Sequence, residues 1–138
     1  MAIERNNSVT GRNTCAAGAC GLQDCAATVM CTVVSTSRPG QAIIDGGSKT
    51  FSSDRFTTPS EVTFGHVVDD PAAAFTKMNE EHGYMDVRRA SRRWAVGDRL
   101  RVIPNHVCTA MNLHEKAYGV RGERVETAWE VAGRGKLQ

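Results

Sequence analysis

The sequence predicts a mainly β fold, either a small β-barrel or a sandwich, with one main helix near residues 71–82. Three observations carry this prediction. β-branched residues fill residues 26–35, shorter apolar or alternating segments recur along the chain, and Gly or Pro stands between several of them. One helix among several strands favours a closed or stacked β architecture over an α/β sheet.

The expected strands can be placed in order. The run 26–35 is followed by a turn at Arg38-Pro39-Gly40, and a short strand at 41–45 completes a hairpin. A third strand over 62–68 is interrupted by Gly65, which indicates a bulge or a close backbone approach. Three further strands are expected at residues 99–103, 117–121 and 124–131.

The single helix is predicted from its end signals. Asp70 can cap it, Pro71 suits its first position, and Gly83 stands where a left-handed C-terminal cap would fall. Ala74, Phe75 and Met78 would form its apolar stripe.

The chain length limits what the protein can contain. With 138 residues, it fits one domain. A full (β/α)₈ barrel needs about 250 residues, so chemistry that requires such a barrel cannot be completed by this chain alone. Residues 1–22 are expected to form a variable, mobile lead segment, and residues 23–138 to form the β-domain.

The net charge and the hydropathy pattern limit which partners the protein is expected to bind and in which cell compartment it is expected to occur. The formal net charge of +2 does not by itself indicate nucleic-acid or membrane binding. No apolar run is long enough to span a membrane, and the first residues lack the apolar segment of a secretory signal. We therefore expect a cytoplasmic protein in which the five cysteines are thiols, ligands or small core residues.

The sharpest chemical motif is Pro104-Asn105-His106-Val107-Cys108. If it is extended, His106 and Cys108 point to the same side with Cβ atoms roughly 6–7 Å apart, close enough for one zinc ion to contact both. Pro104 argues for a turn instead, and the alternative to a metal site is a buried thiol beside a hydrogen-bonded histidine. His114, Glu115 or a water could supply a third ligand, and the spacing does not distinguish them.

The other cysteines are spaced differently from zinc knuckles. Cys15, Cys20, Cys25 and Cys31 are separated by four, four and five residues, so no metal cluster is expected among them. Cys25 and Cys31 are expected to fill a strand face, and Cys15 and Cys20 to be ordinary thiols.

Six arginines between residues 88 and 101 surround Trp94, a composition that could contact nucleic acid. Asp86 and Asp98 dilute this charge. A solvated loop is the favoured interpretation, and nucleic-acid binding is not expected.

Taken together and in order, several segments resemble the carboxy-terminal domain of the D-serine dehydratase and D-threonine aldolase family. The resemblance spans nearly everything after residue 22, and Pro-Asn-His-x-Cys is its most diagnostic motif. The segments are Gln23–Ser35, Arg38–Asp54, Phe64–Val68, Asn79–Gly83, Val96–Cys108 and Met111–Leu113.

The resemblance implies a fold and a chemistry. Family members are fold-type III enzymes with an alanine-racemase-like plan, in which an amino-terminal barrel binds pyridoxal phosphate (PLP) through a lysine and a β-domain covers the active site. The family's metal pair maps onto His106 and Cys108, which implies a divalent ion, zinc above others, that polarises the β-hydroxyl of the substrate. The barrel is absent from this sequence, and none of its four lysines, Lys49, Lys77, Lys116 and Lys136, matches the cofactor lysine.

These observations lead to a main expectation and an alternative. The chain is expected to be a free-standing metal-binding β-domain, inactive alone, that either completes a separate barrel or is degenerate. No residue is assigned a catalytic or PLP-binding role. The alternative is a non-enzymatic module for oligomerisation or binding.

Overall fold

Six strands close into a barrel in the computed structural model, which describes residues 1–4, 10–18 and 20–136. β9 pairs with β6 on one side and with β2 on the other, so the ring of hydrogen bonds closes. Of the two predicted architectures, the barrel is therefore confirmed. Around the ring the strands are β2 (Ala27–Ser35), β3 (Gln41–Ile44), β8 (Gly83–Asp86), β7 (Ala74–Met78), β6 (Gly65–Val67) and β9 (Arg99–Pro104).

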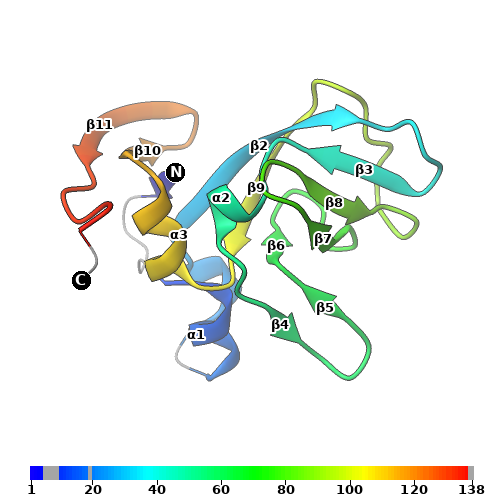
Figure 1. Cartoon of the computed structure of the whole chain (residues 1–138), viewed down its shortest axis with the longest axis horizontal. Coiled ribbons are helices and arrows are strands. Elements are labelled where there is room, and N and C mark those ends of the chain that lie inside the picture. The colour runs from blue at the N-terminus through cyan, green and yellow to red at the C-terminus, as the bar shows by residue number, and fades with distance from the viewer. Residues whose placement is uncertain (5–9, 19, 137–138) are drawn as a thin grey trace.

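Three strands extend the sheet beyond the barrel. β1 (Ala2–Glu4) runs antiparallel to β2 and parallel to β10 (Lys116–Arg121), and β10 forms a hairpin with β11 (Arg124–Glu130). Figure 1 shows this hairpin on the opposite side of the molecule from β3, β7 and β8. A separate two-stranded ribbon consists of β4 (Phe56–Thr57) and β5 (Val62–Thr63).

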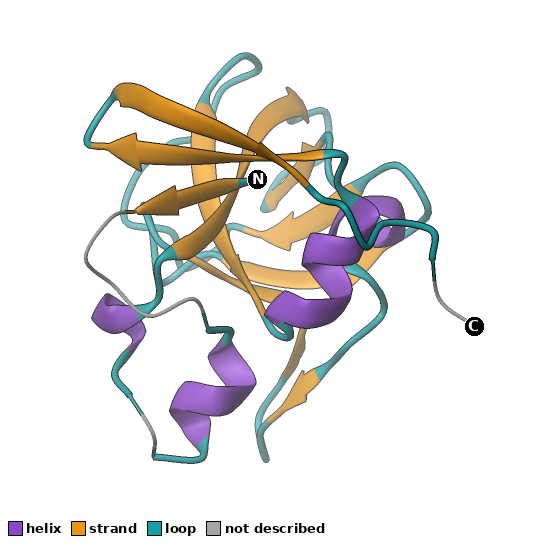
Figure 2. Cartoon of the chain, turned by 90° about the vertical axis from the view of Figure 1, so that its left-hand side faces the viewer, coloured by secondary structure: helices purple, strands orange, loops and turns teal. Residues whose placement is uncertain are grey.

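The helices are short and lie outside the barrel. They are α1 (Arg12–Ala16), the 3₁₀ turn η1 (Leu22–Asp24), α2 (Ser48–Phe51) and α3 (Val107–Leu113). α2 packs beside α3, and α1 lies with η1 at a separate edge of the fold (Figures 1 and 2). None of the helices in the described ranges has the length and apolar character needed to cross a membrane.

Apolar side chains fill the barrel. Phe75 is fully buried at its centre and packs edge-on against Phe51, with ring centroids 5.3 Å apart. The strand predicted over residues 26–35 is confirmed as β2, and its buried face is made by Val29, Cys31 and Val33, while Met30 is exposed. The hydrophobic effect of this burial is what holds the ring closed.

The predicted helix over residues 71–82 is wrong. Residues 71–73 form a turn, β7 follows, and Asn79 to His82 form the loop of a hairpin with β8. The side-chain Oδ1 of Asn79 accepts hydrogen bonds from the backbone N–H groups of Glu81 (3.0 Å) and His82 (2.7 Å), which stabilises the loop.

The residues taken as helix signals have other roles. Asp70 is buried and accepts the backbone N–H of Ser91, so its carboxylate anchors a distant loop. A Cβ at Gly83 would lie 2.7 Å from both the carbonyl oxygen of Gly46 and the Phe75 ring, so this glycine provides space inside the barrel. Packing of Phe75 in the core overrides the local helix propensity.

The remaining predicted strands are found within one or two residues of their expected positions, and the predicted interruption of 62–68 separates β5 from β6. Within the expected lead segment 1–22, residues 5–9 and 19 lie outside the described residues. The described part contains β1, which pairs with β2 and β10, so ordered structure begins before residue 23.

Candidate metal centre at the β9–α3 corner

His106 and Cys108 lie where the last barrel strand turns into α3. β9 ends at Pro104, His106 is the N-cap of α3 with extended backbone angles (φ −131°, ψ 109°), and Cys108 lies in the first helical turn. The extended strand geometry first considered for 106–108 is therefore replaced by a corner, as Pro104 suggested. Both side chains are accessible: 46% of the His106 side chain is exposed, and Cys108 is an exposed free thiol.

Asn105 anchors this corner from beneath. It is only 1% exposed, and its side-chain amide donates to the carbonyl oxygens of Thr63 (2.8 Å) and Asp54 (3.0 Å). The backbone carbonyl oxygen of Asn105 accepts a hydrogen bond from the backbone N–H of Asn13 at the start of α1 (3.0 Å). One buried residue thus joins β9 to the β5 ribbon and to α1.

Asp54 is the acidic group that the structure places beside the histidine. Its Oδ1 lies 3.6 Å from Nδ1 of His106, while its Oδ2 accepts hydrogen bonds from the Thr109 hydroxyl (2.7 Å) and the Ser52 hydroxyl. These hydroxyl hydrogen bonds, Ser52 first, lower the pKa of Asp54 and keep the carboxylate ionised.

This arrangement places a negative charge beside the imidazole. A carboxylate at Nδ1 favours the tautomer that carries its proton there, which leaves Nε2 with a free lone pair. The sequence did not single out Asp54, because it lies 52 positions before His106 and only the fold brings them together. The one available signal was that Asp54 ends a segment resembling the enzyme family.

The residues at the corner fit a metal ion. A neutral imidazole nitrogen and a thiolate sulfur are typical zinc donors, and neither is sealed in the core. The alternative of a buried thiol is wrong for Cys108. Two of the three candidates for a third ligand are side chains: His114 follows the last residue of α3 and contacts the Thr50 carbonyl (3.2 Å), and Glu115 is paired with Arg134 (2.7 Å). The fold does not bring either to the His106 end of the helix.

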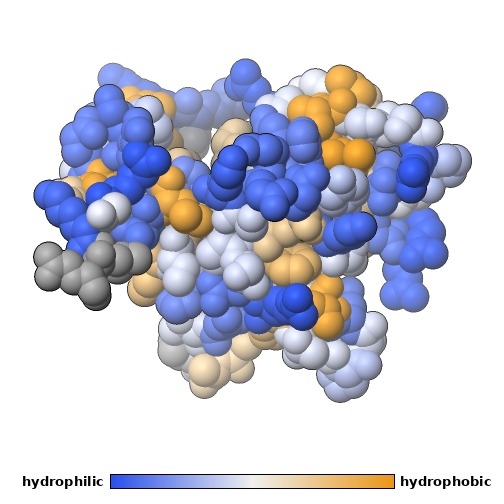
Figure 3. All heavy atoms as spheres, viewed as in Figure 1, coloured by the Kyte–Doolittle hydropathy of each residue, from blue (hydrophilic) through white to orange (hydrophobic). Residues whose placement is uncertain are grey.

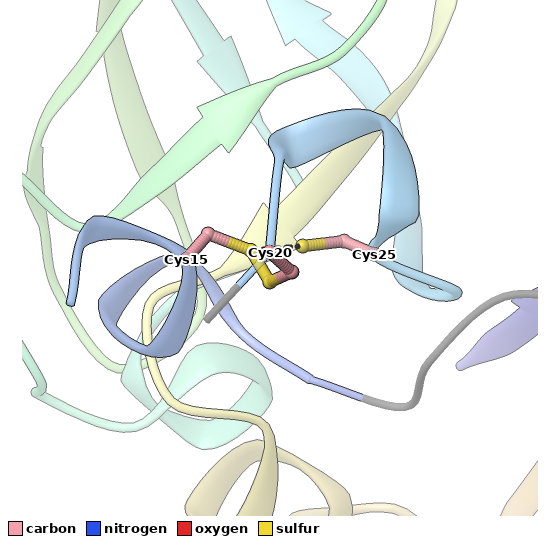
Figure 4. Close-up of side chains that lie close together, drawn as sticks. All are labelled: Cys15, Cys20 and Cys25. Carbon is pink, nitrogen blue, oxygen red and sulfur yellow. Dashed lines mark hydrogen bonds between the residues drawn. A yellow bond between two sulfur atoms is a disulfide. The ribbon is translucent and has the colours of Figure 1, made fainter. Parts of the chain in front are cut away.

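A second group of donors forms at the α1–η1 edge. Cys15 and Cys20 are joined in a disulfide, and Sγ of Cys25 lies 3.2 Å from Sγ of Cys15 (Figure 4). The expectation that Cys15 and Cys20 are ordinary thiols is therefore wrong, and the fold brings together three cysteine sulfurs among which no metal cluster was expected. α1 and η1 fold the chain back on itself, which the knuckle spacing does not describe. Cys25 and Cys31 are buried, as expected.

Three of the six arginines in the arginine-rich stretch are paired with acidic side chains. Arg92 contacts Asp98 (2.8 Å), Arg101 contacts Asp69 (2.7 Å), and Arg88 pairs with Asp86. This pairing weakens the positive electrostatic potential that would attract a nucleic acid to the stretch.

Comparison with known proteins identifies the fold and its relatives. A family model described as "Putative serine dehydratase domain" matches residues 26–120. An uncharacterized protein of Mycobacterium tuberculosis is 40% identical over 124 residues, covering 86% of this chain and 91% of that protein. D-threonine aldolase of Arthrobacter sp is 33% identical over 107 residues, covering 78% of this chain but 26% of the enzyme.

Solved structures agree. An alanine-racemase-like protein from Idiomarina loihiensis superimposes with a TM-score of 0.74 at 21% identity, over 85% of this chain and 34% of that chain, which supports the fold.

Two variants of D-threo-3-hydroxyaspartate dehydratase also superimpose. The one with a histidine replaced by alanine has a TM-score of 0.74 at 27% identity and covers 85% of this chain. The other, with a cysteine replaced by alanine and in a metal-free form, has a TM-score of 0.70 at 28% identity and covers 82%. The enzyme of this name from Delftia sp. HT23 has a TM-score of 0.67 at 28% identity.

The match to these enzymes is partial in length. The chain spans about a quarter of the aldolase and 34% of the dehydratase, but nearly the whole of the mycobacterial relative. With the match over residues 26–120 and the closed barrel, the chain belongs to the serine dehydratase domain family, as a counterpart of one part of the longer enzymes.

Proposed function

We propose that this chain is a metal-binding β-domain, in which His106 and Cys108 donate to one divalent ion, preferably zinc. The observation that carries the proposal is the exposed β9–α3 corner, where Asp54 stands at Nδ1 of His106 and a free thiol follows two residues later. The corner leaves both a nitrogen donor and a sulfur donor accessible to solvent.

The spacing in a relative supports the choice of residues. The histidine and the cysteine replaced in the two dehydratase variants stand two positions apart, as His106 and Cys108 do, and the cysteine variant was solved in a metal-free form. That relation is a property of the dehydratase, and we extend it to this chain through the shared fold.

The chemistry follows from the donor set. A divalent ion held there would supply Lewis acidity toward a hydroxyl group, such as the β-hydroxyl of a D-hydroxy amino acid. The contribution of this chain is to hold the imidazole in one tautomer through Asp54, to fix the corner through Asn105, and to leave Nε2 and Sγ accessible to a partner's active site.

In this proposal, full lyase activity also needs a PLP-binding barrel, which residues 1–138 do not contain. Because the chain corresponds to about a third of the dehydratase, we propose that PLP is supplied by a separate barrel domain that this β-domain covers, or that catalysis has been lost. We place the protein in the cytoplasm, where PLP-dependent amino-acid metabolism is accessible to it.

Zinc binding tests the proposal directly. In a competition titration against a chromophoric chelator, we expect His106→Ala and Cys108→Ala each to abolish most binding at this site, because two protein donors act together. His82→Ala is the matched control, since His82 is an exposed histidine on the β7–β8 loop, away from the corner. Equal zinc affinity in all four proteins would refute the assignment.

Turnover tests the incomplete-enzyme part separately. We expect no D-serine or D-threonine consumption by the isolated chain with PLP and zinc, since the family's cofactor lysine has no counterpart here. Robust turnover would show that the chain is a complete enzyme.

One observation favours a second function, an oligomerisation module. A groove between β1, β2 and the β10–β11 hairpin carries Met30, Tyr118 and Val125, whose exposed fractions are 53%, 40% and 57%. These exposed apolar side chains are a candidate contact with a second copy. Figure 3 shows that the face drawn there is mostly hydrophilic, with small apolar patches. Sedimentation at high concentration discriminates: a dimer dissociated by Val125→Glu supports this function, and a strict monomer removes it.

A further inference from the structure

Three cysteines outside the β9–α3 corner form a compact cluster. The Sγ atoms of Cys15, Cys20 and Cys25 all lie within 4.8 Å of one another. Figure 4 shows the three side chains converging from three short segments: α1, the stretch after it, and the end of η1. We call these residues the cysteine triad.

Its scaffold is anchored at both ends. The N–H of Asn13 in α1 donates to the Asn105 carbonyl (3.0 Å), and a Cβ at Gly11 would lie 2.7 Å from that same oxygen, so α1 is pressed against the end of β9. On the other side, the Asp24 carboxylate accepts the N–H of Gly21 (2.8 Å) and closes η1, and Cys25 is 7% exposed. The two backbone segments that flank the cysteine triad, α1 and η1, are therefore each held in place by these contacts.

The sulfur positions suit a thiophilic cation. Three thiolates around a tetrahedral zinc ion, with bonds of about 2.3 Å, lie about 3.8 Å apart. Cys15 and Cys25 are 3.2 Å apart, and no pair exceeds 4.8 Å. Once the Cys15–Cys20 disulfide is opened, small side-chain rotations bring all three sulfurs to the required separation, and a water completes the coordination.

We propose that the reduced cysteine triad, Cys15, Cys20 and Cys25, is a second zinc site, independent of His106 and Cys108, and that the Cys15–Cys20 disulfide is its metal-free, oxidised state. Three thiolate donors select a soft or borderline ion such as zinc over magnesium or calcium, which prefer oxygen ligands.

The two states exclude each other for a chemical reason. In the disulfide, the sulfurs of Cys15 and Cys20 carry no thiolate charge and bind a cation poorly. An external dithiol reduces the bond: it gives two electrons and two protons, the S–S bond breaks to two thiols, and the dithiol becomes a disulfide itself. Zinc then displaces three protons, one from each cysteine thiol. Zinc content at the triad thus reports the thiol state of the chain.

The test is a set of full-length variants whose zinc stoichiometry is measured after reduction with a non-thiol phosphine. The background carries Cys108→Ser, which removes the corner thiol. In that background we expect one equivalent of zinc, falling to none on adding Cys20→Ser or Cys25→Ser. Cobalt(II) in place of zinc should give the intense thiolate charge-transfer absorption of the background protein and lose it in the same two variants.

Three controls make the result decisive. Magnesium in excess should not displace zinc, the oxidised chain should take up no zinc at the triad, and circular dichroism should show that each variant keeps the β spectrum. A folded, reduced Cys108→Ser protein that binds no zinc, or whose zinc binding survives Cys25→Ser and Cys20→Ser, would overturn the proposal. Failure of the corner site would instead show as unchanged zinc binding on replacing Cys108 alone, so the two proposals fail separately.

Discussion

The barrel interior consists of buried apolar side chains, whereas the β9–α3 corner carries polar side chains that are accessible to solvent. In the barrel, Phe75 and its neighbours are sealed from water and carry no chemistry beyond packing. At the corner, the loop between α2 and β4 and the start of α3 bring Asp54, His106 and Cys108 to an accessible surface. Stability depends on the barrel interior, and the proposed zinc binding depends on the corner. Substitutions confined to one of these regions should therefore change stability or zinc binding, but not both.

The largest effect on stability is expected from emptying the barrel. Phe75→Ala removes a fully buried ring that packs on Phe51 and Phe64, and it should lower the free energy of unfolding by about 3–5 kcal/mol. Urea unfolding measures this. Val96→Ala, at a position that is 65% exposed and outside the β10–β11 groove, is the control and should change it by less than about 0.5 kcal/mol. A loss below about 1 kcal/mol for Phe75→Ala would show that the barrel is not the stabilising core.

Asn105 connects the two regions, so its loss should affect both. Asn105→Ala leaves the carbonyl oxygens of Asp54 and Thr63 without their buried donor, at a cost of about 1–3 kcal/mol. We also expect weaker zinc binding, because the corner is no longer fixed. Paired urea unfolding and zinc titration check this, and a variant that loses stability with unchanged zinc affinity would separate Asn105 from the site.

Asp54 should affect the metal far more than the fold. Asp54→Asn keeps the shape of the side chain but weakens its hold on Nδ1 of His106, and we expect zinc affinity to fall by about 10–100-fold. Glu123→Gln, which makes the same charge change on the β10–β11 turn, is the matched control. Unchanged zinc affinity in Asp54→Asn would mean that the carboxylate does not orient the imidazole.

The smallest effect belongs to a surface ion pair. Hydrogen bonds from Arg88 lower the pKa of Asp86 to about 2, below its ordinary value near 3.8. The pair therefore contributes stability above about pH 4 and loses it as the pH falls through 2. The Arg88 side chain is 77% exposed, so screening by solvent keeps the contribution small.

Stability of Asp86→Asn measured between pH 7 and pH 2 checks this. The variant should differ from the unmodified chain at pH 7, and the difference should vanish near pH 2. A difference that grows on acidification would contradict the assignment.

Local patterns predicted the strands well where burial alternates. The run containing Val29, Cys31 and Val33 carries its own period, so β2 is readable from sequence alone. The segment 71–82 was not, because Asp70, Pro71 and Gly83 are also the residues that a buried anchor, a turn and a crowded barrel wall require. Only contacts with Ser91 and Gly46, both distant in sequence, decide between a helix and the observed turn and strand.

The candidate metal site also combines residues that a local motif predicts with a residue that only the fold brings close. His106 and Cys108 are two positions apart and could be proposed from their motif, whereas Asp54 reaches them only through the closed fold. The cysteine triad was missed for a related reason. Its spacing is unlike a zinc knuckle, and it becomes a cluster only because α1 and η1 reverse the chain.

The most direct test of the central claim is the zinc content of the full-length chain purified with its Cys15–Cys20 disulfide closed, which leaves the β9–α3 corner as the site under examination. Elemental analysis after zinc supplementation should give about one zinc per chain, and almost none in His106→Ala or Cys108→Ala. A zinc-free unmodified chain, or equal zinc in all three proteins, would contradict the account.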